Sequence, residues 1–267
     1  MPPKQPWSSS IDPSLALTHA FKRPTPQNEE CNVGAAVRSV LGASSLTPST
    51  SSTSSTSFDP PSIEVIVVDG HSHDGTVREA RQAGATVLRA SKPGRAGQMN
   101  QGANAAKGDV IMFLHADSTL PADYTRLVEA SIGREKHQWG SFRSIDIGIK
   151  NPLGSFLIKQ GVALRTRLLH KPYGDQCIFV RRKTFTEVGG YKDMPLLEDV
   201  DLVTRLSAHA GPPSIIERDL KTSGRRWQSL GILRTTMLNQ YILLRHAMGA
   251  DLNALAKLYS SGGQMSR

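Results

Sequence analysis

The sequence predicts an α/β fold, built as a doubly wound and mostly parallel sheet with flanking helices. Two patterns lead to this class. Short apolar runs rich in β-branched residues alternate with segments of helical character, and polar residues follow the ends of these runs. Hydrophobic residues make up 38% of the 267 residues, which is enough for one sizeable core and excludes disorder for most of the chain.

The regular alternation begins at residue 63. It consists of a strand at 63–68, a helix at 76–83, a strand at 86–89, a helix at 95–106 and a strand at 109–114. Thr76 and Glu79 have the spacing of a capping box, which would start the first helix. Ligands of such sheets bind beyond the carboxyl ends of the strands, so the residues after each strand are the first site candidates.

The second half of the chain is less regular. It is expected to hold a basic helix at 151–170, a short strand at 176–180, a helix at 197–208 that opens with acidic residues, and a helix at 229–248. The last helix carries a stripe of large apolar residues: Leu230, Leu233, Met237, Tyr241, Leu244 and Met248. The ten residues between Arg234 and Arg245 are uncharged, but a membrane span needs roughly 20. The stripe therefore either packs against the sheet or lies on a membrane surface without crossing it.

The charge of the chain favours acidic partners. Lys and Arg outnumber Asp and Glu by 32 to 23, which gives a formal net charge of +9. The 63 residues from Arg205 hold nine basic and three acidic residues, so they contribute +6. A nucleic-acid partner is not expected, because no run of five or six like charges occurs and aromatic residues make up only 6%.

Charged and polar residues stand at the ends of two predicted strands. Asp69 follows the first strand, in VVDGHSHDGT, where a carboxylate could face a nucleotide in a loop rich in free N–H groups. His115 and Asp117 follow the third strand, in FLHADSTLP, where they could share a divalent ion such as Mg²⁺ or Mn²⁺. Taken alone, each motif is better explained by an ordinary turn or helix cap.

A third cluster consists of Glu198, Asp199 and Asp201 at the start of a helix. The helix dipole accounts well for one or two of these acids, but crowded carboxylates can also supply a general base.

Two further segments carry candidate binding residues. Asp175 and Gln176 precede a short strand and could bind sugar hydroxyls, although a simple turn also explains them. In TSGRRWQ, Arg225 and Arg226 could clamp a phosphate and Trp227 could stack on a sugar or base, although the segment could also be a basic surface turn with one buried tryptophan.

In this order, the motifs resemble those of glycosyltransferase family 2, whose members have the GT-A fold. The resemblance is closest to the radical-SAM/selenodomain-associated transferases. It covers roughly residues 62–260 and rests on VVDGHSHDGT, GRAGQMNQGANAAKGDVIMFLHADSTLP, YGDQCIFVRR, VGGYKDMPLLEDVDL, and TSGRRW followed by LRTTMLN. It implies a metal-assisted, inverting transferase with a UDP- or GDP-linked sugar donor. The resemblance does not identify the acceptor, but it implies that lipid-linked compounds are one possible class of acceptor.

The resemblance also implies roles for the candidate residues. Asp69 would contact the base or ribose of the donor. Asp117 would ligate Mg²⁺ or Mn²⁺ at the donor diphosphate, with His115 at the place of the first Asp of the family's D-x-D motif. Asp199, next to Glu198, would be the base that deprotonates the acceptor hydroxyl.

The donor pocket would contain further residues. Arg226 and Trp227 match the end of the family's Q-x-x-R-W motif, and Asp175 and Gln176 would bind the sugar. Ser223 stands where the motif has Gln, which argues against a processive polymerase.

The N-terminal part departs from the family pattern. Relatives begin with an apolar strand that runs into P-T-x-N-E, but LALTHAFKRPTPQNEE at 15–30 makes a poor central strand. Residues 44–57 contain twelve Ser and Thr among fourteen and are expected to be a flexible insertion. The expected organisation is a poorly ordered or degraded first strand at 1–30, a GT-A domain at 31–228 and an amphipathic helical segment at 229–267.

Two alternative functions stay open. A nucleotidyltransferase of similar fold would carry a Gly-rich phosphate loop near its first strand, and residues 1–62 contain none. A catalytically impaired relative is compatible with the unusual N-terminal part. The N-terminus has no apolar segment of a secretory signal, so the expected location is the cytoplasm or the cytoplasmic face of a membrane, with organelle targeting left open.

Overall fold

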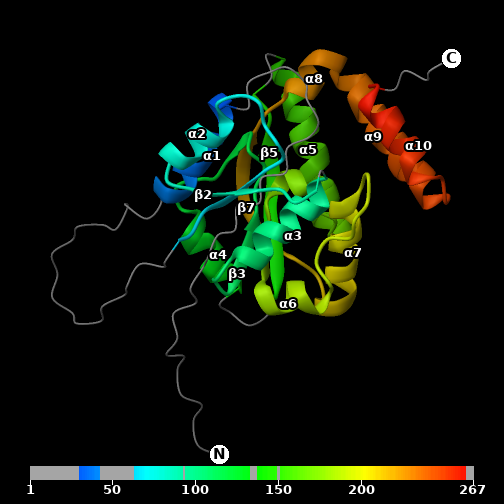
Figure 1. The fold of residues 1–267 in the computed structure, drawn as a ribbon. Helices are drawn as coiled ribbons and strands as arrows, with labels where there is room; N and C mark the ends of the chain where they lie inside the picture. Colours follow the sequence, from blue (N-terminus) through cyan, green and yellow to red (C-terminus); the bar gives the residue numbers. More distant parts are fainter. Residues whose placement is uncertain (1–29, 43–62, 93, 133–136, 149–150, 263–267) are drawn as a thin grey trace, which may run out of the picture.

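The computed structural model describes residues 30–42, 63–92, 94–132, 137–148 and 151–262 (Figure 1). The expectations for residues 1–29 and 44–57 lie outside these ranges and stay predictions. The first half of the fold contains α1 (Glu30–Leu41), β1 (Ile66–Asp69), α2 (Thr76–Gln82), β2 (Thr86–Arg89), α3 (Arg95–Ala105), β3 (Val110–Phe113), β4 (Ser118–Thr119) and α4 (Tyr124–Ile132). The second half contains β5 (Trp139–Asp146), α5 (Pro152–Leu169), the 3₁₀ turn η2 (Gly174–Gln176), β6 (Ile178–Arg181), α6 (Arg182–Glu187), α7 (Glu198–Ala210), β7 (Ser214–Thr222), α8 (Arg225–Leu230), α9 (Ile232–Ala247) and α10 (Leu252–Ser260).

The described strands form two sheets. β1 and β2 pair in parallel, and the second sheet has the order β3-β6-β5-β7-β4. In the second sheet β5 and β7 are parallel, whereas the other three pairs are antiparallel. The α/β class is confirmed, but the sheet is mixed rather than mostly parallel. Apolar runs indicate burial on both faces and carry no information on strand direction, which explains the difference.

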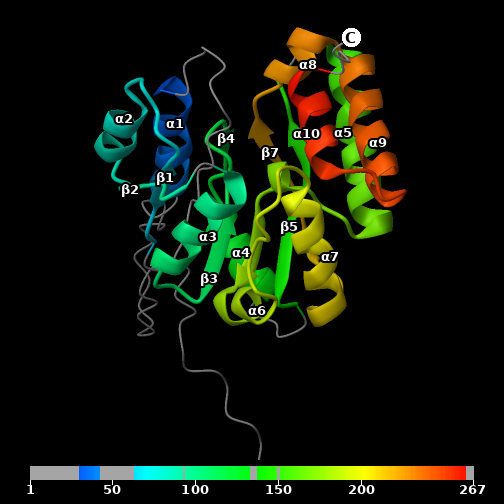
Figure 2. The ribbon, with the colours of Figure 1, turned by 45° about the vertical axis from the view of Figure 1, so that its right-hand side comes forward.

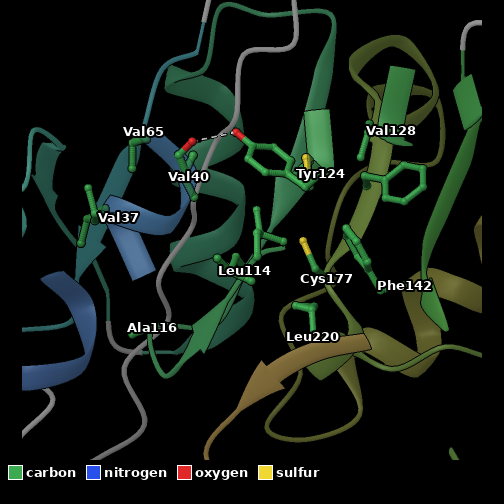
Figure 3. Close-up of a cluster of buried hydrophobic side chains, with 14 of the residues drawn as sticks. Val37, Val40, Val65, Leu114, Ala116, Tyr124, Val128, Phe142, Cys177 and Leu220 are labelled. Atoms are coloured by element: carbon green, nitrogen blue, oxygen red, sulfur yellow. Dashed lines mark hydrogen bonds between the residues drawn. The ribbon is translucent and has the colours of Figure 1, made fainter. Parts of the chain in front are cut away.

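Helices cover both faces of the strands and create two buried clusters. Alternate residues of one strand belong to different clusters: Val110 and Met112 to the first, Ile111 and Phe113 to the second. Figure 3 shows part of the first cluster, in which the Tyr124 hydroxyl donates to the Val40 carbonyl oxygen at 3.2 Å. This packing fixes β3, whose carboxyl end leads into the candidate site.

Two local predictions are wrong. Thr76 is not the N-cap of α2, because that position belongs to Gly75, and the Thr76 amide donates instead to Asp74 Oδ1 at 3.1 Å. The expected helix at 229–248 is two helices, α8 and α9, separated by Gly231 with a φ of 83°. That left-handed conformation interrupts the helix and is accessible to glycine at little cost.

α9 and α10 pack together at one side of the molecule, beside α5 and far from α1 and α2 (Figures 1 and 2). Leu238 and Ile242 of α9 and Leu255 of α10 form a small buried cluster of their own. In the described parts of the chain, no helix is both long enough and apolar enough to cross a bilayer.

Candidate active site

The carboxyl end of β3, the turn η2 and the start of α7 converge on one place. The Gly174 amide of η2 donates to Asp199 Oδ2 of α7 at 2.8 Å. A Cβ atom added at Gly174 would lie 3.3 Å from Asp199 Oδ2 and 3.3 Å from His115 Nε2. The structure therefore brings His115 and Asp199 together, although they are far apart in the sequence.

His115 and Asp117 are the polar residues beyond β3. His115 Nε2 is buried and has no hydrogen-bond partner among the described residues. Asp117 Oδ2 lies 3.3 Å from Arg225 Nη2, and its side chain keeps 25% of its surface exposed. The Nε2 atom of His115 thus lacks a partner among the described residues, and the Asp117 carboxylate, two residues later, can contact water.

Asp175 lies in the same cluster. Its Oδ1 atom is buried without a hydrogen-bond partner among the described residues. Burial raises the pKa of Asp175, and the nearby carboxylates of Asp199 and Asp117 raise it further, whereas Arg165 and His115 oppose this shift. The Asp175 carboxyl therefore holds a proton more readily than an ordinary aspartate does.

The three acids at the start of α7 have different environments. Glu198 is 3% exposed and forms an ion pair with Arg95 at the start of α3. Asp201 is paired with Lys192 at 3.0 Å and with Arg205 at 2.6 Å.

Burial alone would raise the pKa of Asp201, but the hydrogen bonds from Arg205 and Lys192 outweigh burial and lower it. Asp199 accepts hydrogen bonds from the backbone amides of Gly174 and Val200, both at 2.8 Å. Within the described residues Asp199 has no ion pair, unlike Glu198 and Asp201.

Asp69 terminates β1 and is 5% exposed. Its two carboxylate oxygens accept from the Ser72 amide at 3.1 and 3.3 Å, which holds the loop after the strand. Helix α3 connects β1 to the rest of the site, because the Gln98 side chain donates to the Val68 carbonyl oxygen at 3.5 Å and Arg95 pairs with Glu198.

Gln176 occupies a structural position rather than one that faces a ligand. It is completely buried, and its amide nitrogen donates to the carbonyl oxygens of Phe142 and Arg143, both at 2.9 Å. Its amide oxygen accepts from Arg165 at 2.7 Å and from the Tyr173 amide at 3.1 Å. These bonds tie η2 to β5 and α5, so Gln176 supports the site and has no group left for a donor sugar.

Arg226 and Trp227 also differ from their predicted placement. Arg226 donates to the Tyr259 carbonyl oxygen at 2.7 Å and stacks over the Tyr259 ring at 3.7 Å, while Trp227 packs against the first buried cluster. Arg225 instead points to Asp117. Successive residues of a helix are about 100° apart around its axis, so neighbouring arginines reach different elements.

Sequence reasoning assigned no role to Arg95, treated Gly174 only as part of a turn, and treated Arg225 only as one of two arginines that could clamp a phosphate. The only available signal was their position inside or next to the quoted motifs GRAGQMNQG, TSGRRW and YGDQ. Their function depends on contacts with residues far away in the sequence, which a motif does not reveal.

The described residues contain no group of three or more His, Cys, Asp or Glu side chains arranged to hold a metal ion by themselves. Mg²⁺ is commonly bound through one or two carboxylates, with substrate phosphates and water as the other ligands.

Comparison with known proteins gave consistent results. Residues 27–188 match the family described as Glycosyl transferase family 2. The fold is similar to that of S. aureus TarS 1-349, with a TM-score of 0.55 and 14% identity over 78% of this chain and 61% of that one. The present chain therefore spans less than two thirds of TarS 1-349. No curated protein matches the sequence significantly.

Two further structures share the fold and were solved with ligands. Mannosyltransferase PcManGT from Pyrobaculum calidifontis, in complex with GDP-Man and Mn²⁺, has a TM-score of 0.53 and 18% identity over 96% of this chain and 73% of that one. Glucosyl-3-phosphoglycerate synthase from Mycobacterium tuberculosis, in complex with Mn²⁺, UDP and glucosyl-3-phosphoglycerate, has a TM-score of 0.51 and 18% identity over 79% and 75% of the two chains.

Proposed function

Because the chain belongs to glycosyl transferase family 2 and has the GT-A fold, we propose that it transfers a sugar from a nucleotide-sugar donor to an acceptor hydroxyl group. The donor is UDP- or GDP-linked, and the reaction inverts the configuration at the anomeric carbon. The family match carries this proposal, and the ligands of the similar structures support the donor class. We also propose that the chain belongs to the radical-SAM/selenodomain-associated subgroup of the family.

Asp199 is the proposed general base. It would take the proton from the acceptor hydroxyl, and its position next to His115 without an ion pair among the described residues supports this role. Glu198, which the sequence also suggested as catalytic, is neutralised by Arg95 and holds the start of α7 in place. Its role is that of a positioning residue.

The residues beyond β3 fit a divalent ion. Asp117 and the unpartnered Nε2 atom of His115 would hold it together with diphosphate oxygens. When bound, Mg²⁺ or Mn²⁺ would neutralise the charge that develops on the leaving nucleoside diphosphate. Arg225, beside Asp117, would add a second positive group that binds phosphate oxygens.

The donor would extend from Asp69 at the nucleoside to Asp175 at the sugar. Asp175 Oδ1 is buried and has no hydrogen-bond partner in the described part of the chain, so a sugar hydroxyl would supply the missing hydrogen bond. For the acceptor we propose a lipid-linked compound, reached by a chain that works at the cytoplasmic face of a membrane. Support for this location is the basic C-terminal part with its apolar stripe.

The test combines binding with turnover. We expect titration calorimetry with Mn²⁺ to detect binding of UDP or GDP, and Asp117→Ala to abolish it. The matched control is Asp123→Ala, because Asp123 is an aspartate paired with Arg126 and Arg218 at the surface. Unchanged binding by Asp117→Ala would contradict the metal assignment.

Asp199→Asn should bind the donor normally but release nucleoside diphosphate from UDP-GlcNAc or GDP-Man roughly 10²–10⁴-fold more slowly. Asp201→Asn is its control. If the wild-type protein binds nucleotide but transfers no sugar, it is an impaired relative. If it forms a nucleotide-sugar from a sugar phosphate and a nucleoside triphosphate, it is a nucleotidyltransferase.

A further inference from the structure

Large apolar side chains are exposed at one place in the described part of the chain. All of them belong to α5, to α9 or to Met248, which caps α9. On α9 they are Leu233, Met237, Tyr241 and Leu244, and with Met248 their exposed fractions lie between 46 and 73%. The sequence predicted this stripe but left open whether it packs against the sheet. The structure shows that it does not.

A second apolar stripe runs along α5. Its members are Leu153, Phe156, Leu157, Leu164, Leu168 and Leu169, which are 55–68% exposed. Leu153, Leu157, Leu164 and Leu168 follow one another at intervals of four, seven and four residues, so they lie on one face of the helix.

Both helices are firmly packed on their other faces. Ala163 and Thr166 of α5 are buried, and the Lys159 carbonyl oxygen accepts from the Ser144 hydroxyl of β5 at 3.0 Å. Leu238 and Ile242 of α9 are buried against α10. The exposed stripes are therefore second, outward faces of helices that already have a core contact.

The two stripes belong to one region of the surface. Ile232 at the start of α9 reaches Gly154 near the start of α5. Both views of the fold show α5 and α9 beside each other, on the side of the molecule away from α1 and α2 (Figures 1 and 2). Scattered exposed apolar residues need no explanation, but two stripes of them on neighbouring helices indicate a binding surface.

The charge around these stripes selects the kind of partner. The sequence has no acidic residue between Asp146 and Asp175, or between Asp219 and Asp251. Arg234 and Arg245 are exposed on α9 and form no ion pair with the described residues, whereas Arg167, exposed on α5, pairs with Glu217 of β7 at 2.6 Å. A second copy docked face to face would place these cations against one another. An anionic lipid surface would complement them and also accept the apolar side chains.

We propose that the α5–α9 face, defined by these two apolar stripes and their exposed arginines, docks onto the surface of an anionic bilayer. The docking stands independently of the proposed transfer reaction. One consequence of the docking does rest on the proposed function, namely that the site would receive its acceptor from the bilayer. The site lies near this face, because Arg225 of α8 contacts Asp117 and α8 directly precedes α9.

Vesicle co-sedimentation of the full chain tests this docking. We expect binding to vesicles that contain phosphatidylglycerol, weak binding to pure phosphatidylcholine, and a decrease with salt. Arg234→Glu with Arg245→Glu should lower the partition coefficient at least about 30-fold, since each surface cation contributes about fivefold. Arg81→Glu with Lys183→Glu, an equal charge change at exposed residues of α2 and α6, should have a much smaller effect.

A second variant tests the apolar contribution. Leu164→Gln with Leu244→Gln should weaken binding about tenfold or more without lowering the melting temperature, because both side chains are already exposed. Equal recovery in the supernatant with and without anionic vesicles would overturn the proposal. So would a dimer in sedimentation equilibrium that the same variant dissociates. Because the assay contains no nucleotide, its failure is distinguishable from a failure of the proposed function, which titration with UDP and Mn²⁺ measures separately.

Discussion

Replacement of Arg95 by alanine should destabilise the fold through Glu198. The Glu198 side chain is 4% exposed, and Arg95, which is 28% exposed, is its ion-pair partner. Removal of one partner from a buried pair costs about 3–5 kcal/mol, because the remaining charge stays desolvated. The opening that Arg95 leaves would admit some water, so the lower end of that range applies. At roughly 2–4 °C per kcal/mol for a domain of this size, the melting temperature should fall by about 6–12 °C.

Glu198→Gln should cost less. It leaves Arg95 without its ion-pair partner, but the Arg95 side chain is 28% exposed and the nearby Asp199 carboxylate still favours its charge. The double variant, Arg95→Ala with Glu198→Gln, removes both charges and should be more stable than Arg95→Ala alone. Urea unfolding of the wild type, both single variants and the double variant gives the coupling free energy, which we expect to be about 1–3 kcal/mol.

Arg126→Ala is the matched control. Arg126 forms an exposed pair with Asp123 at 3.7 Å and should contribute less than about 0.5 kcal/mol. The reasoning is refuted if Arg95→Ala costs no more than this control, or if the two single changes are additive. Either result would mean that Glu198 is solvated in the folded chain and does not hold α7 through Arg95.

Two further outcomes follow from the site. Gly174→Ala would place a methyl group 3.3 Å from both Asp199 Oδ2 and His115 Nε2, so these groups must shift by tenths of an ångström. We expect turnover to fall by about 10–100-fold with little change in donor binding, and equal turnover in a steady-state assay would contradict this. The lowered pKa of Asp201 means that its pairs with Arg205 and Lys192 stabilise the fold above the ordinary aspartate pKa, and that this contribution is lost as the pH falls through the lowered pKa. Asp201→Asn should therefore be less stable than wild type at pH 7, with the difference shrinking below about pH 4 in urea unfolding; a constant difference would argue against the shift.

The alternating strands and helices between residues 63 and 114 could be predicted from the sequence, because buried strands and amphipathic helices have distinct periods. β7 was missed. Its sequence, SIIERDLKT, mixes charged and apolar residues because the strand is partly exposed. The antiparallel direction of β6 could also not be predicted from the sequence, because antiparallel and parallel central strands show the same apolar run.

The candidate site was predicted as a set of residues but not as a network. The sequence pointed to His115, Asp175 and Asp199, and the structure places them in one cluster. It could not distinguish Glu198 from Asp199, because the cation that neutralises Glu198 comes from a residue 103 positions earlier. Chemistry near a motif is visible in a sequence, whereas the pairing that selects one carboxylate depends on the tertiary fold.

Helix α8 explains why the C-terminal helices are not an independent segment. It is only six residues long, yet three consecutive residues reach three different parts of the molecule. Arg225 contacts Asp117 in the site, Arg226 binds Tyr259 of α10, and Trp227 packs into the main core. A boundary between residues 228 and 229 would cut through this helix. The Thr235 hydroxyl of α9 donates to the Arg226 carbonyl oxygen of α8 at 3.4 Å, and Ile232 of α9 reaches Gly154 of α5, so α9 is tied to the same framework that holds Asp117.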